Sequence, residues 1–188
     1  AICDEVNARY RGRLRCSPET TPGSIYNLTA LASGELDLAL AQSDWLVRAI
    51  DGKMPRIASD RASLIRLVRP LYTEAITILA RADSGIESKA DLAGKRVNLV
   101  ELSVSHYLLA RALDGAGLAE RDLAAVVNTS DADMVAAWQT PDVEAVVTWN
   151  PLVSTIMEMG NAAKVADSSD IPGEIIDMMV VNTETLAA

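Results

Sequence analysis

The sequence is poor in the residues that carry metal and nucleophilic chemistry. His106 is the single histidine, and the two cysteines, Cys3 and Cys16, both lie near the N-terminus. A zinc site needs a set of cysteine and histidine ligands at short spacings, and no such set is present. A serine, cysteine or aspartate nucleophile would have only His106 as its base. We therefore expect no catalytic residues, no metal and no cofactor.

Long apolar runs and a surplus of basic residues are also missing. No run approaches the roughly 18 apolar residues that span a bilayer, and no charged segment followed by an apolar one opens the chain. The formal net charge is −9, and the one basic cluster, Arg11, Arg13 and Arg15, alternates along a stretch that we predict to be a strand. We interpret these arginines as the solvent-exposed face of that strand rather than as a nucleic-acid-binding surface. We expect a soluble, processed chain with no nucleic-acid partner.

The cysteines leave two states open. An even count at short separation fits one disulfide, Cys3–Cys16, in an oxidising compartment. Two free, buried thiols fit nearly as well.

One unit recurs along the chain. Runs rich in Val, Leu and Ile are each followed by a polar turn and a stretch with helical spacing, which predicts an α/β fold. The predicted strands are 36–42, 96–101, 124–128, 143–149 and 175–181. The segment 65–82 contains Pro70 and is too broken for one helix, so we expect it to run from one lobe into another.

The predicted helix starts are well marked. Capping residues precede the helical spacing at Ser24, Ser43 or Asp44, Ser105, Ser130 with Asp133, and Asn150 with Pro151. In open α/β sheets the helix N-termini gather where the strands end, and ligands bind in that crevice. The loop 16–27, CSPETTPGSIYN, is therefore a candidate half of a ligand site. A capping serine beside an ordinary threonine turn is the alternative.

Four features of the first half occur together. They are the cysteine pair, T-x-G-S-x-Y-N at 21–27, G-E-L-D-L-A-x-x-Q-S-D-W at 34–45 and D-L-x-G-K-R-V-N at 91–98. With them, the first half resembles the TAXI family of substrate-binding proteins, which serve TRAP transporters.

After KRVNL the pattern changes. The chain reads VELSVSHYLLARALDGAGL, then NTSDADMVAAW, VEAVVTWNPLVSTI and DSSDIPGEIIDMMVVNTETL. These stretches resemble the nitrate, sulfonate and taurine type of ABC-transporter binding protein, and most of all the branch associated with urea-carboxylase operons.

Both families share the type II periplasmic-binding fold, so the resemblance implies an α/β protein with two lobes and a ligand cleft. We assign 1–81 to a TAXI-like lobe one, to which 175–188 returns, and 82–174 to an ABC-type lobe two. A join at the shared DLAGKRVNL would preserve this architecture, so we hypothesise a chimera; a divergent natural member is the alternative. Proteins of this class usually begin with a further strand and end with further helices, so we expect the fold to be incomplete at both ends.

The candidate ligand-binding residues come from both lobes. Thr20, Thr21 and Ser24 are candidates because of their hydroxyl groups, and Gly23 because it lets the backbone approach a ligand. The family resemblance implies the other candidates. Lobe one supplies Thr20, Thr21, Gly23, Ser24, Tyr26, Asn27, Gln42 and Ser43, with Glu74 near the hinge. Lobe two supplies Glu101, Ser103, Ser105, His106, Thr148, Trp149 and Asn150.

Three of these candidates have a second reading. Trp149 either stacks on a planar ligand or fills the core beside Val147. His106 is either a ligand contact or an ordinary residue of a capping turn. Glu101 would repel an anion but suits an amide or guanidinium ligand.

The resemblance implies an extracytoplasmic, periplasmic solute-binding protein that delivers a small ligand to a TRAP or ABC transporter, and not an enzyme. The first half implies a small carboxylate or an amino acid such as glutamate, and the second half a urea-like nitrogen compound. A ligand-sensing domain of a regulator and a non-functional chimeric scaffold are the alternatives. We expect a monomer or a domain-swapped dimer.

Overall fold

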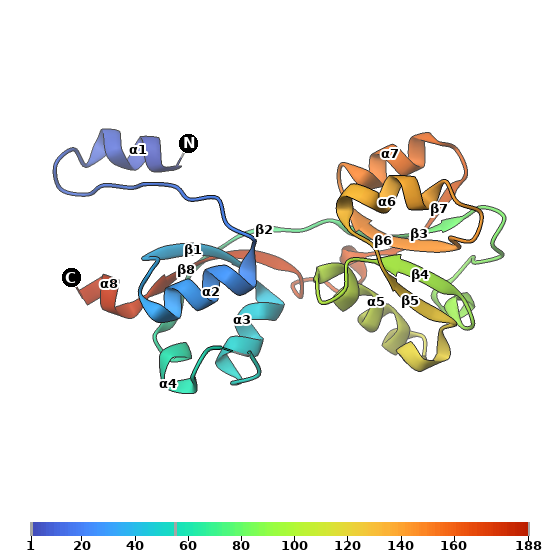
Figure 1. Ribbon diagram of the computed structural model, residues 1–188, viewed down its shortest axis with the longest axis horizontal. Helices are drawn as coiled ribbons and strands as arrows, with labels where there is room; N and C mark the ends of the chain where they lie inside the picture. Colours follow the sequence, from blue (N-terminus) through green and yellow to red (C-terminus); the bar gives the residue numbers. More distant parts are fainter. Residues whose placement is uncertain (1, 55, 188) are drawn as a thin grey trace.

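The computed structural model describes residues 2–54 and 56–187 and contains two sheets, each covered by helices (Figure 1). Residues 1 and 188, which bound the expected lobe ranges, lie outside the described residues. The first sheet has the strand order β1 (Leu38–Gln42), β8 (Ile176–Asn182), β2 (Ile65–Thr73), and both of its pairings are antiparallel. The last long strand of the chain is therefore the central strand of the first sheet.

The helices of the first lobe cover one face of this sheet. They are α2 (Ser24–Ser33), α3 (Ser43–Ile50) and α4 (Ser59–Ala62), and α8 (Thr183–Ala187) follows β8. Gly23, with a φ of 113°, precedes α2, and Gly34 ends it in the left-handed conformation with a φ of 80°. Leu28 and Leu31 of α2 pack with Trp45 of α3 and Val180 of β8 in the first core.

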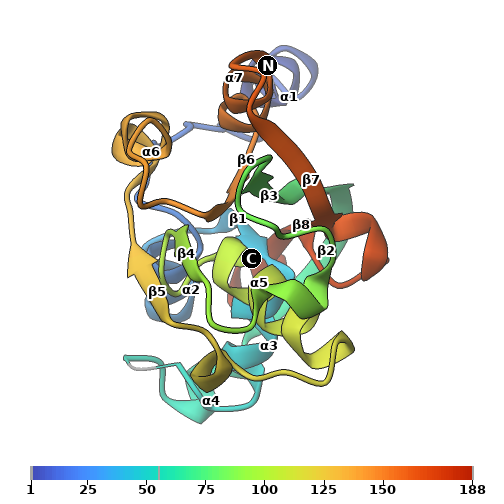
Figure 2. The same cartoon turned by 90° about the vertical axis from the view of Figure 1, so that its right-hand side faces the viewer.

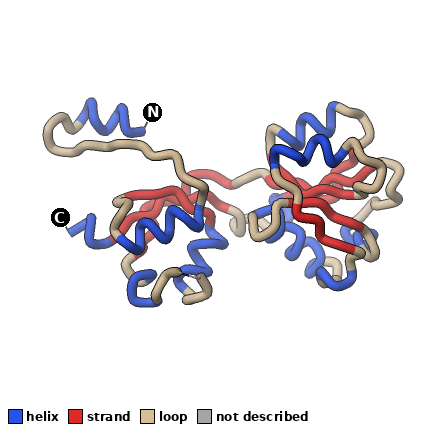
Figure 3. Tube along the Cα trace, viewed as in Figure 1, coloured by secondary structure: helices blue, strands red, loops and turns tan. Residues whose placement is uncertain are grey.

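The second sheet is larger and mixed. Its order is β5 (Ala125–Asn128), β4 (Arg96–Leu99), β6 (Ala145–Trp149), β3 (Ile76–Arg81), β7 (Ala162–Asp167). β4 is parallel to β5 and β6, whereas β3 is antiparallel to β6 and β7. Figures 2 and 3 show α5 (Val104–Gly115) on one face and α6 (Asp131–Trp138) and α7 (Leu152–Glu158) on the other. Short 3-10 helices lie at Lys89–Leu92, Glu120–Asp122 and Ser168–Asp170.

The second lobe has two separate hydrophobic cores, one on each face of its sheet, because successive side chains of a strand point to opposite faces. Ile76 and Ile78 of β3 pack with Leu109 of α5, whereas Leu79 packs with Met134 and Trp138 of α6. Because successive strand residues point to opposite faces, a strand buried on both faces is apolar throughout. This explains why β3 is buried from Ile76 to Ala80, with Thr77 as the one polar residue of that run.

Two segments cross between the sheets. One joins β2 to β3 through Glu74 and Ala75, and the other returns to β8 through 171–175. The N–H of Glu74 donates to the carbonyl of Ile175 at 3.3 Å, so the two crossings are hydrogen-bonded to each other. β3 belongs to the second sheet, so the first crossing lies at 74–75 and not at the expected 81/82 boundary.

The helix starts differ from the expectation in detail. Ser103, and not Ser105, caps α5, because its Oγ accepts from the N–H of Ser105 at 3.1 Å. Ser130 precedes α6, but its hydroxyl donates to the Asp133 carboxylate at 2.6 Å and forms no side-chain cap. Pro151, and not Asn150, is the N-cap of α7, and no side chain among the described residues caps this helix. Asn150 Oδ1 accepts from the N–H and the hydroxyl of Ser154.

An N-terminal arm precedes the first lobe. It contains α1 (Ile2–Arg9), which buries no residue, and the Cys3–Cys16 disulfide, whose Cα atoms are 4.9 Å apart. The strand expected around Arg11, Arg13 and Arg15 is wrong: these residues lie in a turn and an exposed loop. A strand needs a hydrogen-bonding partner, and the described strands offer none here.

We expect the disulfide to stabilise only this arm. A 15-residue loop closure is worth about 3 kcal/mol when the loop is part of the cooperative unit. Because α1 contributes no buried residue, the double variant Cys3→Ser/Cys16→Ser should lower the main thermal midpoint by less than about 1 °C. Thermal unfolding, with reduced wild type as the control, tests this. A fall of 5 °C or more would mean that the arm unfolds together with the lobe.

Among the described residues, no helix combines the length and the apolar character needed to cross a membrane.

Candidate functional site

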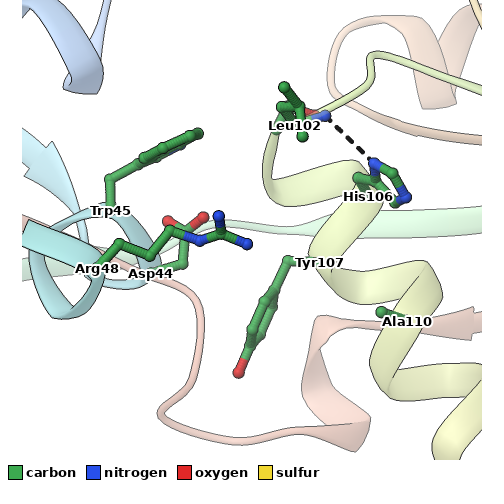
Figure 4. A pocket seen from close by; sticks show the side chains of 8 residues that line it. Asp44, Trp45, Arg48, Leu102, His106, Tyr107 and Ala110 are labelled. Carbon is green, nitrogen blue, oxygen red and sulfur yellow. Dashed lines mark hydrogen bonds between the residues drawn. The ribbon is translucent and has the colours of Figure 1, made fainter. Parts of the chain in front are cut away.

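A pocket of about 170 Å³ lies where the first lobe meets the second (Figure 4). Helix α3 supplies one wall and the start of α5 the other. The lining residues are Asp44, Trp45, Arg48, Leu102, Ser103, His106, Tyr107 and Ala110. The lining residues come from the first two turns of both helices, together with Leu102 and the N-cap Ser103 before α5.

The α3 wall combines a cation, an aromatic ring and a carboxyl group. The guanidinium of Arg48 lies over the ring of Trp45 at 5.2 Å and extends toward α5 (Figure 4). Burial raises the pKa of Asp44 above its ordinary value, against hydrogen bonds from backbone N–H groups and the charge of Arg48. Among the described residues that line the pocket, Arg48 alone carries a permanent positive charge.

The α5 wall is held by capping contacts. His106 Nδ1 accepts from the N–H of Leu102 at 3.2 Å, and Nε2 lies 2.9 Å from the Glu120 carboxylate. The ring proton therefore belongs on Nε2, where it is donated to Glu120. Both nitrogens of His106 are engaged, which agrees with its reading as a residue of a capping turn.

In the first lobe, three predicted site residues form one hydrogen-bonded chain. Ser24 Oγ, at the start of α2, accepts from the N–H of Gln42 at 3.0 Å. Gln42 Nε2 donates to the Glu74 carboxylate at 2.8 Å. The chain joins α2, the β1–α3 junction and the first crossing.

The carboxyl group of Glu74 has a raised pKa. Burial is the largest cause; the charges of Asp177 and Asp44 add to it, and the hydrogen bond from Gln42 opposes it. The folded state therefore holds the Glu74 proton more tightly than the unfolded state does. This contributes stability below the ordinary value of 4.5 that is lost as the pH rises through the folded-state pKa.

Glu74→Gln should therefore gain stability relative to wild type as the pH is raised from 4 to 7. We expect the two thermal midpoints to coincide near pH 4 and the variant to be higher by roughly 2 °C at pH 7. Thermal unfolding across this range measures the difference. Glu158→Gln, at an exposed position of α7, is the matched control. A pH-independent difference for Glu74→Gln would contradict the assignment.

Other predicted site residues lie away from the pocket. The hydroxyl of Tyr26 donates to Glu35 at 3.1 Å, and Tyr26 is 40% exposed. Trp149 packs on the second core, which agrees with the alternative reading of this residue. Thr20 and Glu101 are exposed, and Thr21 and Gly23 lie in the loop before α2. Their contact with a ligand stays a prediction.

Four predicted residues serve the fold, and three of them have an oxygen without a partner. Ser43 Oγ donates to the Glu174 carbonyl at 2.6 Å, and Asn27 Nδ2 donates to the Leu40 carbonyl at 2.8 Å. Asn27 Oδ1, Ser105 Oγ and Thr148 Oγ1 are buried without a hydrogen-bond partner. An unpaired buried oxygen is costly, so these three positions call for a bound water or a ligand.

Of the eight lining residues, only Ser103 and His106 were among the predicted site residues; the others are Asp44, Trp45, Arg48, Leu102, Tyr107 and Ala110. Arg48 is four residues after Asp44 and Tyr107 four residues after Ser103, which places each pair on one helix face. Since Asp44 is a predicted helix start, this i, i+4 spacing is a signal that could have identified Arg48; the predicted start at Ser105 gives no such signal for Leu102 or Tyr107.

A two-sheet α/β fold whose lobes are joined by two crossings is the fold of periplasmic solute-binding proteins. The crystal structure of the periplasmic aliphatic sulphonate binding protein SsuA from Escherichia coli matches with a TM-score of 0.80 and 26% identity, over 98% of this chain and 56% of that one. The alkanesulfonate-binding protein SsuA from Xanthomonas axonopodis pv. citri, bound to MOPS, matches with a TM-score of 0.69 and 25% identity, over 97% and 60%. The expected two-lobed α/β fold is confirmed.

The chain belongs to the NMT1-like family, whose model matches residues 1–188. It is also 33% identical over 153 residues to an Escherichia coli (strain K12) protein described as a candidate aliphatic sulfonates-binding protein, over 80% of this chain and 44% of that one. The chain thus spans less than half the length of this curated relative. One family model covers both halves, and these matches support neither a TRAP-transporter relative nor a join of two parents.

Proposed function

We propose that this chain is the ligand-binding part of a periplasmic solute-binding protein of an ABC importer, and that it captures a small organic anion with a sulfonate head. The observation that carries the proposal is the pocket between α3 and α5, because its two walls belong to different lobes. A ligand bound there contacts both lobes and favours the closed arrangement. The similarity to sulfonate-binding proteins supports the choice of transporter and ligand.

The pocket chemistry suits an anionic head on an apolar tail. Arg48 offers a planar set of N–H donors, which a sulfonate accepts in the same way as a carboxylate or phosphate. The first turn of α5 adds a partial positive charge. Trp45, Leu102 and Ala110 line the pocket with apolar surface, and the volume of about 170 Å³ restricts the ligand to a small one.

The ligand class is tested by thermal unfolding in the presence of matched compounds. The panel holds methanesulfonate, ethanesulfonate, taurine, acetate, glutamate, nitrate, urea and guanidinium. Only a ligand that binds the folded state raises the midpoint, by an amount equivalent to about 2.7 kcal/mol at one hundred times Kd. We expect the short alkanesulfonates to do so in a concentration-dependent way. A response to urea or guanidinium alone would overturn the sulfonate assignment, and a response to no compound would overturn the binding function.

A further inference from the structure

Glu174 contacts both walls of the pocket without lining it. Its carboxylate accepts from the Tyr107 hydroxyl at 2.7 Å and from Arg111 Nε and Nη2 at 2.7 and 3.0 Å. Tyr107 and Arg111 are one turn apart on α5. A bidentate pair with arginine and a third hydrogen bond hold the carboxylate in one position on α5.

The backbone of the same residue is bound to the other lobe. The hydroxyl of Ser43, the first residue of α3, donates to the Glu174 carbonyl at 2.6 Å and accepts from the N–H of Ile176 at 3.1 Å. The α3 residues that line the pocket begin at the next position, Asp44. Glu174 therefore connects the first turn of α3 to the side of α5, and we call this set of contacts the Glu174 bridge.

The local sequence fixes where Glu174 lies. Residues 171–174 read Ile-Pro-Gly-Glu, and the N–H of Glu174 donates to the carbonyl of Ile171 at 3.2 Å. Gly173 has a φ of 81°, which suits the third position of a type II turn after a proline. This turn lies in the second crossing, so the Glu174 bridge is built on the segment that joins the lobes.

The Glu174 bridge also binds the guanidinium of Arg111, which leaves the guanidinium of Arg48 as the cation that faces the pocket. All three nitrogens of the Arg111 guanidinium donate to carboxylates: Nη1 to Asp114 at 2.8 Å, and Nε and Nη2 to Glu174. The guanidinium of Arg48 instead extends into the pocket (Figure 4). The bridge holds Tyr107 at the pocket wall and keeps Arg111 away from it.

We propose that Glu174 is a positioning residue: it sets the separation of the α3 and α5 walls, and through that separation the ligand affinity of the cleft. Its effect on affinity rests on the proposed binding function, whereas its effect on the lobes does not. When the bridge is removed, the arrangement that fits the ligand becomes a smaller fraction of the free protein. If that fraction falls to about one tenth, the apparent Kd rises about tenfold.

The test measures the distance between the lobes and the affinity in the same variants. Spin labels at Lys53→Cys in the first lobe and Glu158→Cys on α7 report the distance, with the native disulfide kept oxidised; both positions are exposed. Glu174→Ala removes the bridge, and Glu174→Gln keeps its shape without the charge. Asp114→Asn is the matched control, because it removes the other carboxylate partner of Arg111.

We expect Glu174→Ala to at least double the width of the distance distribution without ligand and to raise the Kd for ethanesulfonate about tenfold. Glu174→Gln should lie in between, and Asp114→Asn should change both by less than twofold. An unchanged distribution in Glu174→Ala, or an equal change in Asp114→Asn, would overturn the proposal, as would a lower thermal midpoint with unchanged distribution and Kd. If wild type binds no sulfonate, the proposed function fails while the distances still decide the role of Glu174.

Discussion

Arg48→Glu is expected to weaken the binding of a short alkanesulfonate by about a hundredfold or more. The change removes the one permanent positive charge among the described residues that line the pocket and puts a negative charge in its place. Losing a charge-assisted hydrogen bond costs about 1.5–3 kcal/mol, and the new repulsion adds to that loss. Isothermal titration with ethanesulfonate measures the effect.

Two further variants separate charge from geometry. Arg48→Lys keeps the charge but loses the planar fork, so we expect a smaller loss, of about tenfold. Arg13→Glu makes the same charge change in the exposed N-terminal arm and should leave the affinity within twofold. If Arg13→Glu weakens binding as much as Arg48→Glu, the effect comes from the overall charge and Arg48 is not a ligand contact.

Trp138→Ala is expected to destabilise the second lobe by about 3–5 kcal/mol, the usual cost of removing a large buried aromatic side chain. Trp138 is 0% exposed and packs with Leu79, Met134 and Ile156. Its Nε1 also donates to Asn161 Oδ1 at 2.9 Å. The substitution therefore leaves both a cavity and an unpaired amide oxygen.

Denaturant unfolding of three proteins measures this cost. Trp138→Phe keeps most of the volume and loses only the hydrogen bond to Asn161, so it should cost about 1–2 kcal/mol. Ala137→Gly, at the preceding position of α6, controls for helix propensity and should cost about 1 kcal/mol. A loss below 2 kcal/mol for Trp138→Ala would mean that the α6 side of the sheet can collapse around the missing ring.

The strands were the most predictable part of the fold. All five predicted apolar runs overlap a strand of the structure, whereas β2, β3 and β7 were not predicted as strands. Burial on both faces explains the apolar run of β6, but β1 is partly exposed and still reads as apolar. The strand predicted around 11–15 was wrong. The alternating arginines fit the period of a strand, but no neighbouring strand among the described residues pairs with this segment. Pairing is a tertiary property, so no local pattern can show whether it occurs.

The helix starts were predictable to within two residues. Ser24 and Ser43 are the first residues of α2 and α3, but they do not cap them: the N-caps are Gly23 and Gln42. Ser103 replaces Ser105 as the cap of α5. Either serine can cap a helix, and the choice depends on where the backbone leaves β4. Ser105 is buried and its Oγ has no hydrogen-bond partner among the described residues, so its contact with a ligand stays a prediction.

The sequence by itself determined the α/β class, the order of most strands and helices, and the edge of the sheets where the helix starts gather. These properties follow from periodicity and capping, which act over a few residues. The tertiary structure decided the rest: the pocket between α3 and α5, the exposure of Arg48, the Ser24–Gln42–Glu74 chain and the Glu174 bridge. Ser43 and Glu174 are 131 residues apart in the sequence and share a hydrogen bond. Contacts of this kind depend on how the two lobes pack, so only the folded chain specifies them.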